Sequence, residues 1–195
     1  MELIYPSYPA PLYPLPNVDV PEVIPARGEE IFPVVEPNGM VIGRMARSYA
    51  HSGSMVLHPV VHLHLLNRSG QLYLQKRSMK KDLLPGYWDT AVGGHVSYGE
   101  TVLEALCREA SEELGLYDFN PIPITAYPFQ TVREKELASV FAAIGDFSPT
   151  PDRDEVDEGR WWDFKEIRAA IGEGILTPNF EAEFQKIYKQ LQALL

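Results

Sequence analysis

The feature that most constrains the fold is one strongly helical segment, residues 97–115, which stands between two groups of strand-like runs. Gly115 is placed to end this helix, and the pattern from Ser97 to Glu100 has the S-x-x-E form of a capping box, which predicts the helix start. Apolar residues recur along the segment at helical spacing: Leu103, Leu106, Ala110 and Leu114. A helix flanked by strands in this way predicts a mixed sheet packed between helices.

The strand-like runs are short and are separated by turn-forming residues. They cover residues 31–35, 40–44, 56–66, 71–76, 87–95, 122–130 and 137–144. An acidic loop, 152–158, leads to a further run at 160–164 and a short helix. Thr177 and Pro178 form a good start for a last helix, whose core-facing stripe is Phe180, Phe184, Ile187, Leu191 and Leu194. The pattern predicts an α/β fold without internal repeats.

The N-terminal stretch differs from the rest, because seven of its first 25 residues are proline. Proline fixes φ and removes a backbone donor, so residues 1–28 are expected to form an extended arm before a domain at 29–195. An arm that lies on its own domain or on a partner subunit is favoured over a docking ligand for an SH3-like domain. This arm and the short edge strands are compatible with a homodimer.

Composition excludes several classes of function. The chain has 17 basic and 27 acidic residues among 195, a formal charge of −10, which opposes binding to long nucleic acids. Neither an apolar run of about 18 residues nor a basic, apolar signal start is present, so we expect a cytoplasmic protein without a membrane segment. The single cysteine, Cys107, excludes an internal disulfide and is expected in the core-facing stripe of the helix.

Three carboxylates give the predicted helix its chemistry. Glu109, Glu112 and Glu113 fall within an arc of about 100° on one face. Such carboxylates repel one another unless a cation neutralises them, and Mg²⁺ prefers oxygen ligands. Arg108 lies one turn from Glu112 and could partly balance the cluster. The alternative is a solvated helix face with an ordinary surface ion pair.

The spacing of this segment resembles the Nudix box, G-x5-E-x7-R-E-U-x-E-E-x-G-U, at every specified position from Gly94 to Leu116, with Ala110 as the weak match. The resemblance implies a Nudix-type α/β/α sandwich with a mixed β-sheet packed between helices. It also implies a Mg²⁺- or Mn²⁺-dependent diphosphatase that acts on a nucleoside diphosphate linked to another moiety. Water would attack phosphorus, because a metal ion neutralises the phosphoryl oxygens and acidifies bound water.

The roles of the box residues follow from their positions. The resemblance implies that Glu109, Glu112 and Glu113 bind metal and that one of them can serve as base. Glu100 and Arg108 would hold the loop and helix together, Gly94 would permit a close turn, and Gly115 closes the motif.

Residues 34–167 are also similar to one branch of this superfamily, the type I isopentenyl diphosphate isomerases and related hydrolases. Those isomerases hold a metal with three histidines and two glutamates, which correspond by position to His51, His58, His95, Glu134 and Glu136. A single histidine would favour a polar residue on a loop or strand end, whereas the joint spacing of the three makes metal binding an equal alternative. His62 and His64 lie at period two on a strand, as half-buried sheet residues or substrate-facing contacts.

Position 93 departs from the isomerase pattern. The isomerases carry their catalytic cysteine there, whereas this chain has Gly93, which offers no group for proton transfer. A hydrolase of a small diphosphate is therefore favoured over an isomerase. A nucleotide-sensing module that binds without cleaving remains the alternative from another class.

The contacts to substrate are less strongly indicated. Arg77 and Lys81 match isomerase positions that meet the diphosphate, although solvated charges at a hairpin end explain them equally well. Glu155 lies where some Nudix enzymes place an extra carboxylate. Trp161 and Trp162 could stack on a base, but aromatic residues in strands are more often part of the core.

Overall fold

The computed structural model describes residues 26–81 and 83–195 of the chain. These residues form two compact units, of which the first comprises 26–61, 94–106 and 126–139 and the second comprises 62–93, 107–125 and 140–195. Most of the arm predicted at 1–28 lies outside the described residues.

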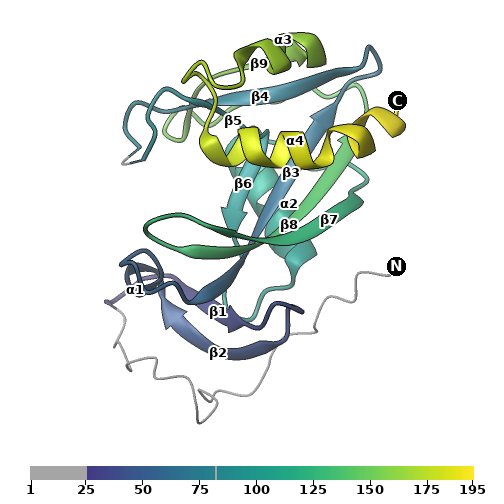
Figure 1. Cartoon of the computed structure of the whole chain (residues 1–195). Helices are drawn as coiled ribbons and strands as arrows, with labels where there is room; N and C mark the ends of the chain where they lie inside the picture. Colours follow the sequence, from purple (N-terminus) through teal and green to yellow (C-terminus); the bar gives the residue numbers. More distant parts are fainter. Residues whose placement is uncertain (1–25, 82) are drawn as a thin grey trace. The chain divides into compact units, whose positions relative to one another are not determined.

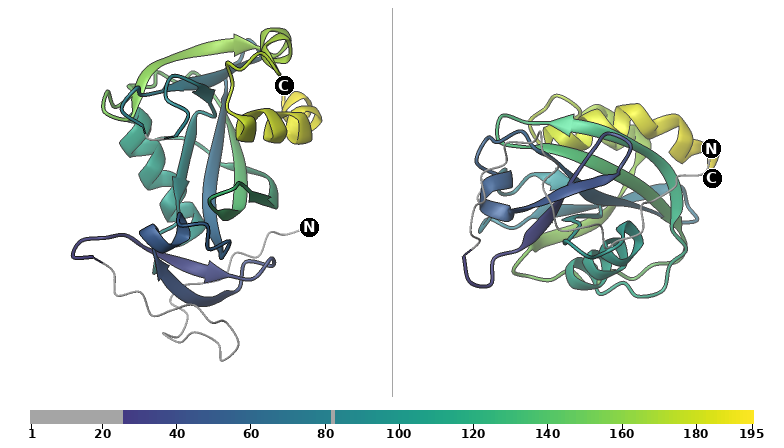
Figure 2. Two further views of the ribbon diagram at one scale, coloured as in Figure 1. Left: turned by 60° about the vertical axis from the view of Figure 1, so that its left-hand side comes forward. Right: turned by 90° about the horizontal axis from the view of Figure 1, so that it is seen from below.

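The first unit contains a two-stranded antiparallel sheet. Strand β1 (Ile31–Val35) pairs with β2 (Val41–Ala46), and Phe32 lies opposite Met45. A short helix that the sequence did not predict, α1 (Arg47–Ala50), follows β2 directly (Figure 2). The buried side chains that join these elements are Phe32, Val34, Met45 and Ala50.

The remaining strands form a seven-stranded sheet of order β5-β4-β3-β8-β7, in which β6 pairs with β3 and β9 with β4 (Figure 1). The run predicted at 87–95 is in fact two short strands. The bounds are β3 Leu57–Leu66, β4 Gln71–Arg77, β5 Trp88–Asp89, β6 Val92–His95, β7 Ile122–Gln130, β8 Lys135–Ile144 and β9 Val156–Asp163. With the helices described below, this sheet confirms the expected α/β architecture.

The pairing of β4 with β9 fixes which side chains share a face. In this antiparallel register Tyr73 lies opposite Trp161, and Gln75 lies opposite Gly159. Because side chains alternate along a strand, Tyr73 and Gln75 project from the same face of the sheet. Strand β9 begins inside the acidic segment predicted as a loop.

Helix α2 (Val102–Leu114) carries the carboxylates and begins later than predicted. Thr101 and Glu104 cap it reciprocally: the Glu104 backbone N–H donates to the Thr101 hydroxyl oxygen (3.2 Å), and the Thr101 N–H donates to the Glu104 carboxylate (2.8 Å). The prediction of a capping box at Ser97 was wrong. The Glu100 carboxylate instead accepts from the Ser97 N–H (3.0 Å) in the turn before the helix.

The buried side of α2 is rotated from the predicted stripe. Leu103 is 44% exposed and Cys107 is exposed, so the predictions for both residues were wrong. The residues of this helix that are buried are Val102, Ala105, Leu106, Ala110, Glu113 and Leu114. Gly115 has a φ of +60° and follows the last helical residue, as predicted.

Two helices complete the second unit, α3 (Phe164–Ala170) and α4 (Pro178–Ala193). Thr177 caps α4, because its hydroxyl oxygen accepts from the Phe180 N–H (3.2 Å), which confirms the predicted helix start. The rings of Phe164 and Phe184 stack 5.8 Å apart and join the two helices. Among the described residues, no helix is both long and apolar enough to cross a membrane.

Candidate active site

The three glutamates of α2 have different environments. Their spacing places them on neighbouring positions of the helix surface. The side chain of Glu109 is 15% exposed and that of Glu112 is 59% exposed, whereas Glu113 is buried. One guanidinium nitrogen of Arg108 donates to Glu109 (2.8 Å) and to Glu112 (3.1 Å). Arg108 therefore holds two of the three carboxylates together.

Glu113 is buried and is oriented by two hydrogen bonds. Its Oε2 accepts hydrogen bonds from the Gln75 side-chain amide (3.1 Å) and from the Gly93 backbone N–H (3.3 Å). Burial, reinforced by the charge of Glu109, raises the pKa of Glu113 to about 8 although these hydrogen bonds and Lys81 oppose the shift. A buried carboxylate beside a second one suits a hard divalent cation, because such an ion offsets both charges and prefers oxygen ligands.

The residues expected to contact substrate are engaged within the protein. Lys81 forms an ion pair with Glu155. The Arg77 guanidinium lies 3.4 Å from Asp89 and donates to the carbonyl oxygen of Leu83 (3.1 Å). The sequence identified Lys81 and Glu155 separately, and the structure places them in one contact.

A second cluster of potential metal ligands lies in the first unit. The ligand atoms of four residues all lie within 4.8 Å of one another: His51, His58, His95 and Glu134. Glu134 Oε2 is 3.0 Å from His51 Nε2, 3.5 Å from His58 Nε2 and 3.9 Å from His95 Nε2. Glu136, the fifth residue of the predicted set, is not part of this group.

Two ligand atoms of this cluster lack a hydrogen-bond partner among the described residues. Although they lie close together, His58 Nε2 and Glu134 Oε2 are buried and make no hydrogen bond of acceptable geometry within the described residues. His58 Nδ1 lies 3.2 Å from the carbonyl oxygen of Val56, a contact that makes Nδ1 the protonated nitrogen and leaves Nε2 as a ligand atom. The ring of Phe32 stacks on His95 at 4.4 Å and covers it.

The charges of the cluster also favour metal binding. Burial lowers the pKa of His95 to about 4, so its ring is neutral near pH 7. Burial alone would raise the pKa of Glu134, but the three histidine rings that face its carboxylate outweigh this effect and lower that pKa. Imidazole rings around a carboxylate are a ligand set that fits a divalent transition metal.

Sequence reasoning missed a third group of titratable residues. His62 Nδ1 and His64 Nε2 each lie 2.7 Å from a different carboxylate oxygen of Glu183, which is 1% exposed. The signal was present in the sequence, because Glu183 follows Phe180 by three residues and so falls on the apolar face of α4. A charged residue on such a face predicts a buried partner.

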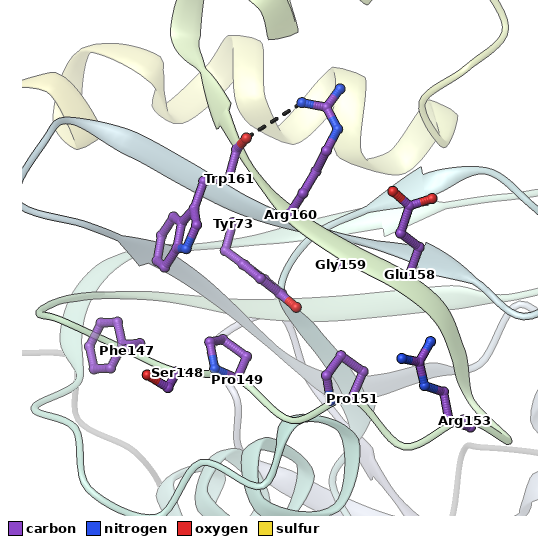
Figure 3. A pocket seen from close by; sticks show the side chains of 10 residues that line it. All are labelled: Tyr73, Phe147, Ser148, Pro149, Pro151, Arg153, Glu158, Gly159, Arg160 and Trp161. Carbon is purple, nitrogen blue, oxygen red and sulfur yellow. Dashed lines mark hydrogen bonds between the residues drawn. The ribbon is translucent and has the colours of Figure 1, made fainter.

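A pocket of about 450 Å³ opens in the second unit beside β4 and β9 (Figure 3). The aromatic rings of Tyr73, Phe147 and Trp161 line it, and Arg153 and Glu158 lie toward its opposite end. The rings of Tyr73 and Trp161 meet edge to face at 5.3 Å. Trp161 is therefore half-buried at a cavity, whereas Trp162 belongs to the core, as expected for a strand aromatic.

Backbone hydrogen bonds connect the wall of this pocket to the C-terminal end of α2. The backbone N–H of Thr150 donates to the carbonyl oxygen of Leu114 (2.7 Å), and that of Asp152 donates to the carbonyl oxygen of Glu113 (2.9 Å). Pro149 and Pro151, which flank Thr150, both line the pocket. The pocket and Glu113 thus share one connected piece of backbone.

Comparison with known proteins identifies the family. The profile of the NUDIX domain matches residues 56–183. The chain is 31% identical over 163 residues to isopentenyl-diphosphate Delta-isomerase 1 of Photorhabdus laumondii subsp. laumondii, covering 79% of this chain and 92% of that relative. It is 32% identical to the uncharacterized Nudix hydrolase all7351 of Nostoc sp., covering 68% of this chain and 79% of the relative.

A solved structure shows the same fold. The crystal structure of DR0079 from Deinococcus radiodurans superposes with a TM-score of 0.72 at 29% identity, and the match covers 82% of this chain and 99% of that one. Together with the box from Gly94 to Leu116, these matches show that the chain belongs to the NUDIX domain family and is a Nudix-type hydrolase.

Proposed function

We propose that this hydrolase cleaves a pyrophosphate bond in a small nucleoside-diphosphate-linked substrate, with Mg²⁺ or Mn²⁺ held by Glu109, Glu112 and Glu113. The observation that carries the proposal is the environment of Glu113. This carboxylate is buried, oriented by two hydrogen bonds and placed beside Glu109, which is costly unless a cation joins them.

Each residue of the site has a distinct task in this proposal. Arg108 keeps Glu109 and Glu112 together, while Gln75 and Gly93 orient Glu113. A divalent ion bound there would neutralise phosphoryl oxygens and make water more acidic. Because the transition state of phosphoryl transfer spreads charge over these oxygens, most of the catalysis would come from positioning and electrostatics.

The aromatic pocket supports a substrate that carries a nucleobase. Tyr73 and Gln75 lie on one face of β4, two residues and thus about 7 Å apart, so the pocket begins near the carboxylate that Gln75 orients. Tyr73 is 4% exposed, and within the described part of the chain its hydroxyl makes no hydrogen bond. A heteroaromatic base could stack on the rings and bond to this hydroxyl.

The histidine cluster supports a second metal site. We propose that His51, His58, His95 and Glu134 bind Mn²⁺ in preference to Mg²⁺, since imidazole suits transition metals better. This site is the feature that an isopentenyl diphosphate isomerase would share. Gly93 disfavours that activity, because it supplies no group for proton transfer to carbon.

One assay separates these activities. We expect the protein, saturated with Mg²⁺ or Mn²⁺, to release a nucleoside monophosphate or phosphate from members of a nucleotide-sugar and dinucleotide panel. Isomerisation of isopentenyl diphosphate without hydrolysis of any member of the panel would show that the proposed activity is wrong. Binding of these nucleotides without product would instead identify a sensing module.

The pocket is tested by Tyr73→Phe, which removes only the hydroxyl. We expect the KM for a nucleotide sugar to rise several-fold while kcat stays within about twofold, because the lost hydrogen bond of about 1 kcal/mol serves binding. Tyr188→Phe is the matched control, since Tyr188 packs against Phe184 away from this pocket. Equal KM values for Tyr73→Phe and Tyr188→Phe would show that this pocket does not bind the nucleobase of the substrate.

A further inference from the structure

The aromatic pocket beside β4 and β9 has a single charge on the side where Tyr73 lies. Because side chains alternate along a strand, Trp161 shares the face of Tyr73, whereas Glu158 and Arg160 project from the opposite face of β9 (Figure 3). Of the described residues that line the pocket, the one other charged side chain is Arg153, from the loop before β9. The aromatic side of the pocket therefore holds a cation and no carboxylate.

The guanidinium of Arg153 is oriented but not consumed by the protein. Its Nη1 donates to the carbonyl oxygen of Asp157 (2.6 Å), and Arg153 forms no other hydrogen bond or ion pair within the described residues. A guanidinium has five N–H donors in a planar fork, so Nε and Nη2 keep theirs for a ligand. One contact thus fixes the loop end of this side chain and leaves its other donors available.

The acids of the same loop do not compete for this guanidinium. Each of the four contacts a different group: Asp152 the backbone N–H of Asp154, Asp154 the ammonium of Lys80, Glu155 the ammonium of Lys81, and Asp157 the backbone N–H of Met79. An arginine that stays without an ion pair among four acids retains its positive charge for an anionic ligand.

The position of Arg153 relative to the aromatic rings indicates what such a ligand looks like. The Tyr73 hydroxyl lies between the rings of Phe147 and Trp161 at one end of the pocket and Arg153 at the other (Figure 3). Burial raises the pKa of Tyr73, and the charge of Arg153 opposes this rise, as expected if the guanidinium faces the phenol. A cavity of about 450 Å³ is large enough for a ligand that reaches from the rings to Arg153.

We propose that Arg153 binds the phosphate of a nucleoside 5′-phosphate whose base stacks at Phe147 and Trp161. This inference rests on the proposed function, because it takes the aromatic end of the pocket as the base site, and it adds the residue that holds the nucleoside's own phosphate. Asp152, the neighbour of Arg153, donates its backbone N–H to the Glu113 carbonyl oxygen (2.9 Å). The bound phosphate therefore lies on the side of the pocket that is connected to α2.

Calorimetry without divalent metal tests this assignment directly. The probes are adenosine, guanosine, cytidine and uridine, each compared with its 5′-monophosphate in EDTA at low ionic strength. We expect at least one monophosphate to bind about tenfold or more tightly than its nucleoside, because a bidentate bond to arginine is charge-assisted. Arg153→Gln should reduce this ratio to less than about twofold. Arg44→Gln is the matched control, since it removes the same charge from an exposed position on β2 outside the pocket and should leave the ratio unchanged.

The ratio of the two affinities separates phosphate binding from a structural role. If Arg153 only held its loop through the Asp157 carbonyl, Arg153→Gln would weaken the nucleoside and the monophosphate by the same factor, and the unchanged ratio would overturn the inference. Arg153→Lys keeps the charge but not the planar fork, so it should lower the ratio by about threefold. This variant also serves as the test if Arg153→Gln does not fold, and an unchanged ratio in Arg153→Lys would then count against the assignment.

The outcomes also distinguish this inference from the proposed function, because binding is measured without turnover. If the unmodified protein hydrolyses nucleotide sugars but none of the four monophosphates binds more tightly than its nucleoside, only the role of Arg153 is wrong. If a monophosphate binds in a manner that depends on Arg153 and no diphosphate is hydrolysed, the hydrolytic function fails. The chain would then be a nucleotide-sensing module that uses the same arginine.

Discussion

The histidine cluster and the carboxylate face of α2 both contain potential metal ligands, but the protonation and the contacts of these ligands differ. In the histidine cluster, three Nε2 atoms surround one oxygen of Glu134 and burial keeps His95 neutral. On α2, burial instead favours the protonated form of Glu113, and Arg108 occupies the other two acids.

This difference indicates different affinities. His95 is already neutral and can bind a metal without first losing a proton, whereas Glu113 must release one at neutral pH. We therefore propose that the histidine cluster retains its ion, whereas the carboxylate face fills when the ion and the substrate phosphates arrive together.

The largest expected effect separates the two regions by activity. Glu113→Gln should lower kcat by about 10³-fold or more, because it removes a ligand from the proposed catalytic ion. The measurement is product release from a nucleotide sugar at saturating Mg²⁺. Glu104→Gln is the control, since this acid lies on the same helix but only caps it, and glutamine serves in that position. A similar loss in both variants would contradict the assignment.

Measuring Mn²⁺ affinity instead of activity tests the role of the histidine cluster. His95→Asn should weaken the tight Mn²⁺ site by about 100-fold, as measured by calorimetry, because one of its four ligands is lost. Glu113→Gln should leave that site intact. If Glu113→Gln abolished the tight site and His95→Asn did not, the roles of the two regions would be reversed.

The pH dependence distinguishes the regions through Glu113. Mg²⁺ affinity at α2 should rise by up to about tenfold per pH unit up to about pH 8, where Glu113 loses its proton, whereas His95 is already neutral throughout this range. In the absence of metal, the stability of the fold depends on pH with the opposite sign. Because the pKa of Glu113 is raised in the folded protein, its contribution to stability is complete below the pKa of glutamate in the unfolded chain and is lost as the pH rises through about 8. Thermal unfolding with and without Mg²⁺ at pH 6.5 and 8.5 measures both effects.

The smallest expected effect is on protein stability and concerns the N-terminal cap of α2, the helix that carries the carboxylates. Thr101→Ala should lower the stability of the protein by about 1 kcal/mol, because it removes the side-chain half of the cap of α2. Ser97→Ala should cost less, since the Glu100 carboxylate contacts the backbone of Ser97 and not its hydroxyl. Denaturant unfolding compares the two, and a larger loss for Ser97→Ala would place the functional cap where the sequence first suggested it.

Spacing alone was enough to place α2, its end at Gly115 and the grouping of three acids, because these depend on local geometry. The cap was misplaced since Ser97-x-x-Glu100 and Thr101-x-x-Glu104 satisfy the same local pattern, and only tertiary context selects between them. Cys107 was misplaced for a related reason, because periodicity gives the width of an apolar stripe more reliably than its centre.

The residues that sequence reasoning could not place are those that pair across long separations. Glu183 contacts His62 across 121 positions, and Lys81 pairs with Glu155. Nothing local to either residue indicates which partner the fold will bring. A buried charge predicts that a partner exists, whereas its identity depends on how α4 and β9 are packed.

The closeness of Tyr73 to Gly159 constrains how this enzyme can vary. A Cβ at position 159 would lie 1.9 Å from the Tyr73 hydroxyl, so the phenol can occupy its place only above a bare backbone. A side chain gained at position 159 therefore requires the phenol of residue 73 to move or to be shortened. The shape of the pocket at β9 is thus coupled to the residue that stands opposite it on β4.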